Sequence, residues 1–284
     1  MFYHKKRQQY FTKPESPDPV YAKQLQELIG GPFGEMTVMM QYLFQGWNCR
    51  GPAKYKDMLL DIGTEEIGHV EMLANLIAHL VDKAPADVQE NAATDPIVKG
   101  LMGGMKAEEV ITASMNPKHA IVSGGGALAA DSTGYPWNGN YIVASGNLLA
   151  DFYSNLQAEA QGRLQAIRLY EMATDAGVKD TLSYMIARDT MHQNQWLAAI
   201  EELKDDGLEG LPVPSKFPRE LEKQEASYQF WNLSEGTDSK EGRWAKGPSI
   251  DGKGEFEYLE NPEPLGPEGE APIPNPKLYS TPKV

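Results

Sequence analysis

Residues 59–80 have the sequence LLDIGTEEIGHVEMLANLIAHL, in which large apolar side chains return every three or four positions. This spacing predicts one apolar face of a long helix. Glu66 and His69 occupy two positions of that otherwise apolar stripe. Because a charged group buried in apolar surroundings is costly unless it is paired or metal-bound, these two residues predict a partner or a metal ion.

The same arrangement returns later in the chain. Asp189 and His192 interrupt a second apolar stripe, again with the carboxylate three positions before the histidine. Each set also has a lone glutamate about thirty residues upstream, Glu35 in the first case and Glu159 in the second. A lone buried histidine is more often a satisfied core residue than a ligand. Two near-equivalent halves instead favour a helical bundle that holds two metal ions.

Apolar periodicity divides the rest of the chain into four helical stretches. They span residues 18–48, with a break at Gly30-Gly31-Pro32, and residues 53–83, 146–174 and 178–204. The segment 84–141 is rich in glycine and turn residues, which is typical of the long crossover between helices 2 and 3 of some four-helix bundles. The predicted fold class is therefore an all-α four-helix bundle with a long crossover.

Three segments are predicted along the chain. Residues 1–17 form an N-terminal arm, residues 18–206 form the bundle, and residues 207–284 form an extended C-terminal segment rich in proline, glycine and charge. Such a tail cannot build a core of its own. It is either disordered or an extended arm held against a neighbouring subunit.

Composition excludes several classes of function. The 284 residues carry 26 Lys and Arg against 40 Asp and Glu, a net charge of −14, so nucleic acid is not an expected partner. The single cysteine, Cys49, rules out an internal disulfide framework. With no signal peptide and no apolar run long enough to span a membrane, we expect a cytoplasmic protein with no membrane partner.

Helix geometry and ligand chemistry narrow the choice of candidate ligands and metals. Glu65 and Glu66 both share a face with His69, but Glu66 matches the apolar period, so Glu65 is expected to support a ligand or to be solvated. Tyr42 and Arg163 lie on faces with candidate ligands and either hydrogen-bond a ligating carboxylate or fill space. Oxygen and imidazole ligands suit manganese or iron, and spacing does not separate the two metals. Nor does it separate peroxide chemistry from oxygen activation or iron storage.

Four stretches resemble those of the manganese (non-haem) catalases. They are GGPFGEMTVMMQYLFQ (30–45), TEEIGHVEMLANLI (64–77), DSTGYPWNGNYI (131–142) and RLYEMATDAGVKDTLSYMIARDTMHQNQW (168–196). The resemblance extends from about residue 20 to residue 236. It implies a ferritin-like bundle, a cofactor of two manganese ions per subunit, and disproportionation of hydrogen peroxide to water and oxygen. It also implies a homohexamer in which the long tails pack on neighbouring subunits.

Carried over by position, the resemblance implies five manganese ligands. Glu35, Glu66 and His69 would hold one ion. Glu66, Glu159 and His192 would hold the other, with the Glu66 carboxylate bridging the pair. These five residues are the ligand set of the family, and Glu66 is the one common to both ions.

Other positions would act around the ligands. Tyr42 would be an outer-sphere hydrogen-bonding partner. Asp189 stands where some members have glutamate, and we interpret it as a proton acceptor or an orienting group, because its shorter side chain reaches a metal less easily. Ala158 stands where some members have arginine, which leaves the gating of the substrate channel open. A calcium site that occurs in some members would use Asp57, Asp61, Asn232, Ser234 and Gly236, whose oxygen ligands suit that ion.

The alternatives differ in what they would do with the same bundle. A ferritin-like di-iron oxidase would usually have fewer histidines and a glutamate in place of Asp189. A structural coat component is the non-enzymatic alternative, since relatives of the family occur in spore coats, and the intact ligand set argues against it. The sequence excludes a haem catalase only weakly.

Overall fold

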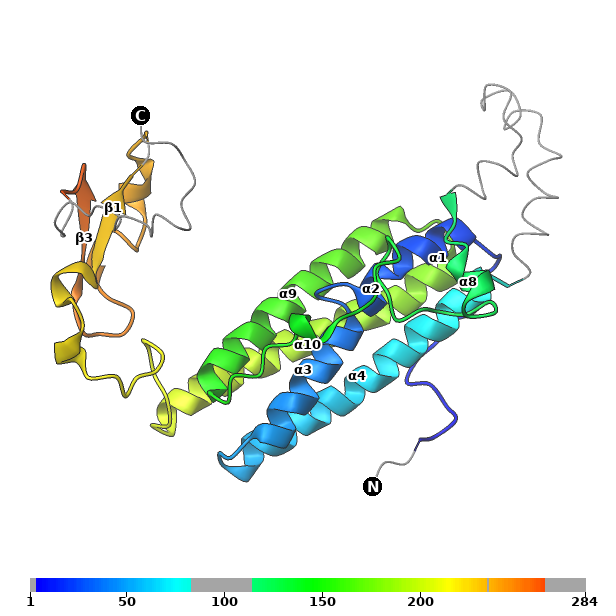
Figure 1. Cartoon of the computed structure of the whole chain (residues 1–284), viewed down its shortest axis with the longest axis horizontal. Coiled ribbons are helices and arrows are strands. Elements are labelled where there is room, and N and C mark those ends of the chain that lie inside the picture. Colours follow the sequence, from blue (N-terminus) through cyan, green and yellow to red (C-terminus); the bar gives the residue numbers. More distant parts are fainter. Residues whose placement is uncertain (1–3, 83–113, 234, 264–284) are drawn as a thin grey trace, which may run out of the picture. The chain divides into compact units, whose positions relative to one another are not determined.

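The computed structural model describes residues 4–82, 114–233 and 235–263 (Figure 1). Contacts within the chain divide it into two compact units that meet between Pro214 and Ser215. The first unit is helical, and the second contains a small sheet. Each unit is described separately below.

Four long helices form the first unit (Figure 1). They are α3 (Glu35–Asn48), α4 (Ala53–Leu80), α9 (Leu148–Met172) and α10 (Ala176–Asp205). Helix α3 packs along α4, and α9 packs along α10. The connections within each pair are short, as expected for antiparallel neighbours. The predicted all-α, ferritin-like four-helix bundle is confirmed, and the connection from α4 to α9 is the predicted long crossover.

The predicted break in the first helical stretch is also confirmed. Two short helices, α1 (Pro19–Leu25) and α2 (Glu27–Gly30), come before it, and α3 starts at Glu35. Helix α10 begins with a side-chain cap, because Asp175 accepts a hydrogen bond from the backbone nitrogen of Val178. The break has one functional consequence: it makes Glu35 the first residue of α3.

A buried glutamine helps to fasten the crossover to the bundle. The Gln26 amide nitrogen donates to the carbonyls of Leu128 (2.8 Å) and Ala130 (2.6 Å), and its oxygen accepts from the Leu128 nitrogen. A side chain at Gly30 would collide with the Ala130 backbone, so this close approach requires glycine. The described part of the crossover also contains α8 (Lys118–Ile121) and the 3₁₀ turn η1 (Gly139–Tyr141).

The bundle core consists of two hydrophobic clusters separated by polar side chains. One cluster includes Leu73 of α4 and Met185 of α10, and the other includes Ile62 of α4 and Trp196 of α10. On both helices the carboxylate and histidine positions lie between these two groups in sequence. Apolar packing above and below therefore fixes the helices on either side of the polar layer.

The N-terminal arm lies along the bundle. The hydroxyl of Tyr10 donates to Asp180 (2.6 Å), and the backbone nitrogen of Thr12 donates to the Thr181 hydroxyl (3.1 Å). Gln8 accepts a hydrogen bond from Asn75 of α4. In the described residues, no helix is long and apolar enough to cross a membrane.

The second unit contains a three-stranded sheet in the order β1-β3-β2. Strand β1 (Gln229–Asn232) pairs in parallel with β3 (Glu255–Glu260), and β2 (Gly247–Pro248) pairs antiparallel with β3. Three 3₁₀ turns accompany it: η2 (Arg219–Leu221), η3 (Gln224–Ala226) and η4 (Asp238–Glu241). These strands were not predicted from the sequence. Residues 264–284 of the predicted extended segment lie outside the described residues.

Candidate metal centre

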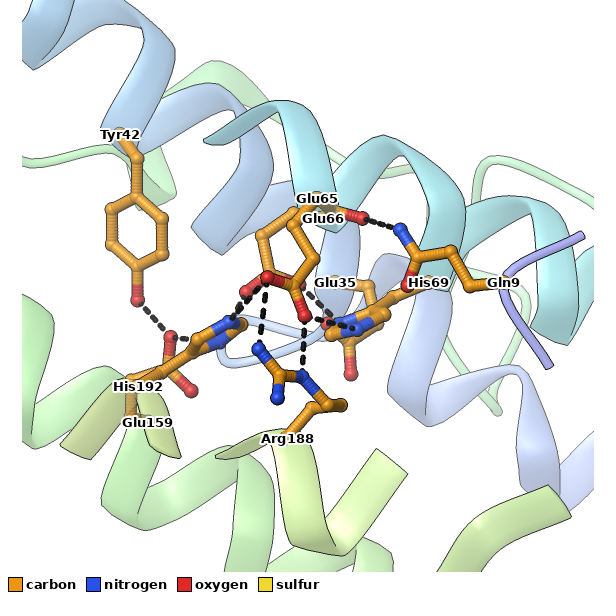
Figure 2. Close-up of polar contacts among 9 residues, drawn as sticks. All are labelled: Gln9, Glu35, Tyr42, Glu65, Glu66, His69, Glu159, Arg188 and His192. Atoms are coloured by element: carbon orange, nitrogen blue, oxygen red, sulfur yellow. Dashed lines mark hydrogen bonds and ion pairs between the residues drawn. The ribbon is translucent and has the colours of Figure 1, made fainter. Parts of the chain in front are cut away.

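Four helices each contribute polar side chains to one layer of the bundle interior (Figure 2). Glu35 comes from the first turn of α3, Glu159 from α9, and the two carboxylate–histidine pairs from α4 and α10. All six side chains are buried, and both histidines are fully buried: Glu35, Glu66, His69, Glu159, Asp189 and His192. Residues far apart in sequence thus meet in one layer.

Two groups of three residues could each hold a metal ion. In the first, Nδ1 of His69 lies 2.6 Å from Oε2 of Glu66 and 3.5 Å from Oε2 of Glu35. In the second, Nδ1 of His192 lies 2.8 Å from Oε1 of Glu66 and 3.4 Å from Oε1 of Glu159. Within each group the ligand atoms lie within 4.8 Å of one another. The Glu66 carboxylate belongs to both groups, with one oxygen directed to each.

The chemistry of these groups fits metal ions. Both oxygens of Glu66 and all four ring nitrogens of His69 and His192 are buried, without a hydrogen-bond partner in the described part of the chain. Leaving such a group unsatisfied costs about 1–3 kcal/mol. Carboxylate and imidazole are ligands for manganese, iron or zinc. A pair of divalent cations would take up both Glu66 oxygens and one ring nitrogen of each histidine.

The electrostatics show how crowded the site is with like charges. Burial, and then the charge of Glu66, raises the pKa of Glu35 well above its usual range. Burial also raises the pKa of Glu159. Burial opposes ionisation of Glu66 too, but His69 and His192 outweigh it and hold the pKa of Glu66 well below its usual range. The central carboxylate therefore stays ionised between two imidazoles, as a bridging ligand must.

Tyr42 supports one ligand directly. Its hydroxyl donates to Oε1 of Glu159 at 2.6 Å, the same oxygen that faces His192 (Figure 2). Burial and the charge of Glu159 raise the pKa of Tyr42 well above its usual range, so the phenol keeps its proton. Arg163 does not contact a ligand, since its Nε donates to the hydroxyl of Thr190 at 3.0 Å.

Asp189 is buried but belongs to neither group of ligands. It lies one helical turn before His192 on α10. Burial, together with the charges of Glu159 and Glu66, raises its pKa well above its usual range. A buried carboxyl that no ion uses is suited to holding a proton close to a reaction.

Sequence reasoning missed Arg188 and left Glu65 open. Nε and a terminal nitrogen of Arg188 donate to the two oxygens of Glu65, at 2.6 and 3.2 Å. The Glu65 carboxylate faces Nε2 of both histidines, on the side of each ring that points away from Glu66 (Figure 2). Arg188 has no place in the apolar stripe, so periodicity could not select it. The signal was the half-buried Glu65, which needs a cationic partner.

The residues predicted for calcium lie in different units. Asp57 and Asp61 are exposed on α4 in the first unit. Asn232 and Gly236 belong to the second unit, where the Asn232 amide donates to the Gly236 carbonyl at 3.1 Å. Ser234 lies outside the described residues. Calcium binding stays a prediction.

Comparisons with known proteins agree on one family. A family model described as manganese containing catalase matches residues 1–281. The chain is 55% identical over 281 residues to a manganese catalase of Bacillus subtilis (strain 168), covering 99% of this chain and 98% of that protein. It is 61% identical over 263 residues to the uncharacterized protein YjqC of the same strain, covering 92% and 91%. The crystal structure of KatB, a manganese catalase from Anabaena, matches with a TM-score of 0.66 and 26% identity, covering 92% of this chain and 100% of that one.

Proposed function

The chain belongs to the manganese-containing catalase family, and from that premise we propose how its own residues carry out the reaction. The enzyme disproportionates hydrogen peroxide to oxygen and water at a dinuclear manganese centre. Glu35, Glu66 and His69 hold one ion. Glu66, Glu159 and His192 hold the other. The observation that carries this assignment is the Glu66 carboxylate, one oxygen of which faces each histidine.

The ions supply the reversible electron storage that lets one peroxide be oxidised and another be reduced. The overall reaction turns two molecules of hydrogen peroxide into one of oxygen and two of water. The peroxide that becomes oxygen loses two protons, and the peroxide that becomes water gains two. The protein must therefore keep protons close to the site between the two halves of the reaction.

Asp189 is our choice for this proton transfer. It is buried in the same layer, and it is not a member of either ligand group. Its raised pKa favours the protonated carboxyl before the ions bind. Divalent cations nearby would favour release of that proton, so the group could both give and take one.

Tyr42 has a different role. Its hydrogen bond fixes Glu159 in one orientation, with the bonded oxygen Oε1 facing His192. The phenol also packs against Trp196, with ring centroids 4.9 Å apart, so its position is set by the core. Burial of the whole ligand layer favours a small neutral substrate such as hydrogen peroxide.

Metal analysis combined with an oxygen-evolution assay tests the assignment. The purified protein should bind two manganese ions per chain and release oxygen from peroxide. His69→Ala should lose manganese and activity together. His79→Ala is a matched control on the same helix, because His79 stacks on Phe11 outside the ligand layer. Full activity in His69→Ala would contradict the ligand assignment.

We further propose that the protein is a cytoplasmic homohexamer in which residues 207–284 pack on neighbouring subunits. Exposed apolar side chains on three bundle helices support an assembly: Phe44, Trp47, Tyr153, Leu164, Met191 and Leu197. Light scattering should then give about six times the 31.4 kDa chain mass. Calcium binding by Asp57 and Asp61 is also proposed, and a chelator that leaves manganese in place tests it.

A further inference from the structure

The carboxylate of Glu65 lies against both histidines on the side away from the bridging glutamate. Its Oε1 is 3.6 Å from Nε2 of His69, and its Oε2 is 3.4 Å from Nε2 of His192 (Figure 2). One carboxylate thus serves two imidazoles, one oxygen to each. These separations are a few tenths of an ångström longer than a full hydrogen bond. They are short enough for a strong charge interaction in a buried site.

Arg188 holds the same two oxygens from the other side. Its Nε donates to Oε1 at 2.6 Å, and a terminal nitrogen donates to Oε2 at 3.2 Å. A two-pronged contact of this kind fixes the plane of a carboxylate as well as its position. The Glu65 side chain is 24% exposed and the Arg188 side chain 33%, so the pair lies at the edge of the site rather than in open solvent.

The histidines need such a partner. A histidine that binds a metal through Nδ1 carries its proton on Nε2, and metal-binding histidines almost always donate that proton to an acceptor. Nε2 of His69 and of His192 are both buried and have no hydrogen-bond partner elsewhere in the described residues. The acceptor that faces both is the carboxylate of Glu65.

We propose that Glu65 is a positioning residue shared by the two manganese sites, and that Arg188 keeps its carboxylate in place. The carboxylate accepts the Nε2 proton of each histidine, which fixes the tautomer and orientation of both rings. The two ions are then coupled through Glu66 on one side and through Glu65 on the other. This inference rests on the proposed assignment of His69 and His192 as ligands.

The N-terminal arm supports the backbone at this point. The Gln9 amide donates to the carbonyl of Glu65 at 2.9 Å (Figure 2). A Cβ atom at Gly68 would lie 2.2 Å from the same amide nitrogen, so a larger residue there would displace the Gln9 side chain. Glu65 is therefore held by its side chain from α10 and by its backbone from the arm.

Two substitutions separate positioning from general stability. Glu65→Ala removes the acceptor for both histidines, so both manganese affinities and the turnover should fall by about 10- to 100-fold. Glu65→Gln has one acceptor oxygen and one donor nitrogen, so it can accept from one histidine only. Titration of metal-free Glu65→Gln with manganese should therefore give two separated binding steps, one of them close to wild type. A general loss of stability would not separate the steps.

The matched control is Glu71→Gln. Glu71 lies on the same helix and also pairs with a histidine, His4, at 3.0 Å, but it belongs to neither ligand group. It should bind manganese and turn over like wild type. Arg188→Lys keeps the charge but not the two-pronged contact, so it should show a smaller loss of the same kind. It replaces Glu65→Ala if that variant fails to fold, as judged by circular dichroism of the metal-free protein.

The outcomes distinguish this inference from the proposed function. If wild type binds two manganese ions and the Glu65 variants bind them with unchanged affinity and turnover, the positioning role is wrong and the ligand assignment stands. If wild type itself binds no manganese, the ligand assignment fails first. Weaker binding in Glu65→Ala, with separated steps in Glu65→Gln and no change in Glu71→Gln, supports the positioning role.

Discussion

The hydroxyl of Tyr42 donates to Oε1 of Glu159 at 2.6 Å, and the same oxygen lies 3.4 Å from Nδ1 of His192. One carboxylate oxygen is thus held by a phenol while it faces a histidine ligand. The phenol comes from α3, the carboxylate from α9 and the imidazole from α10. This hydrogen bond and the Glu159–His192 contact together link three of the four helices at the proposed second ion.

Removing that hydroxyl tests its contribution. Tyr42→Phe keeps the ring packed on Trp196, so the fold should survive with a loss of about 1–3 kcal/mol for the unpaired carboxylate. Manganese affinity or turnover should fall by about 10- to 100-fold, measured by metal analysis and oxygen evolution. Tyr10→Phe is the control, because it also removes a 2.6 Å hydrogen bond to a carboxylate, but on the N-terminal arm. Equal behaviour of the two variants would exclude a special role for Tyr42.

Asp189→Asn separates proton transfer from metal binding. The amide has nearly the same shape as the protonated carboxyl, so the variant should fold and bind two manganese ions. Turnover should fall by about 10²- to 10⁴-fold, the usual contribution of a general acid or base. Asp189→Glu restores a carboxyl and should regain much of the rate. Loss of manganese from Asp189→Asn would instead identify Asp189 as a ligand.

Manganese binding should release protons. Burial alone would lower the pKa of His192, but Glu159, Glu65 and Glu66 outweigh burial and raise this pKa to about 12. The pKa of His69 is also raised well above its usual range, since Glu66 and the neighbouring glutamates outweigh burial. These shifts favour the protonated form of both histidines in the metal-free protein, whereas only a neutral imidazole binds a metal ion.

The affinity for manganese should depend on pH. Because protons compete with manganese, affinity should rise with pH and fall as the solution is made more acidic, by up to about 100-fold per pH unit for two protons. Calorimetric titration in two buffers of different ionisation enthalpy measures the protons released. Equal heats in both buffers, or an affinity that does not change with pH, would contradict this prediction.

Gly63 tests the packing that sets the site. A Cβ atom at this position would lie 3.1 Å from the Leu43 side chain and 3.2 Å from the Leu43 backbone nitrogen. Gly63→Val should therefore push α3 away from α4 and cost about 1–3 kcal/mol. It should also weaken binding of the manganese ion that Glu35 and Glu66 hold, because those ligands come from these two helices. Gly210→Ala, with nothing near the added atom, should melt and bind manganese like wild type.

Periodicity predicted the bundle well because each long helix buries one continuous stripe. The stripe on α4 also separated Glu66 from Glu65: Glu66 is 1% exposed, whereas Glu65 lies at the edge of the site. The break before Glu35 followed from Gly31 and Pro32, which cannot continue a helix. These features depend on residues close in sequence, so one sequence is enough to predict them.

Contacts between distant residues were beyond that reasoning. Arg188 matters because it meets Glu65 across two helices, and Gln26 matters because it holds carbonyls about a hundred residues away. Neither contact has a local signature. Strand β3 did have one, since Glu255, Glu257, Phe256 and Tyr258 alternate between exposed and half-buried. The expectation of an irregular tail hid that short pattern.

The bundle consists of two helical hairpins, and the two proposed ions differ in which hairpins supply their ligands. All three ligands of the first ion come from α3 and α4, which a short loop joins. The second ion takes Glu66 from that hairpin but Glu159 and His192 from α9 and α10. The first ion would therefore join the two helices of one hairpin. The second would join the two hairpins, which the chain itself connects only through its long crossover. If the crossover were cut, the bonds from Glu66, Glu159 and His192 to the second ion would still join the two hairpins.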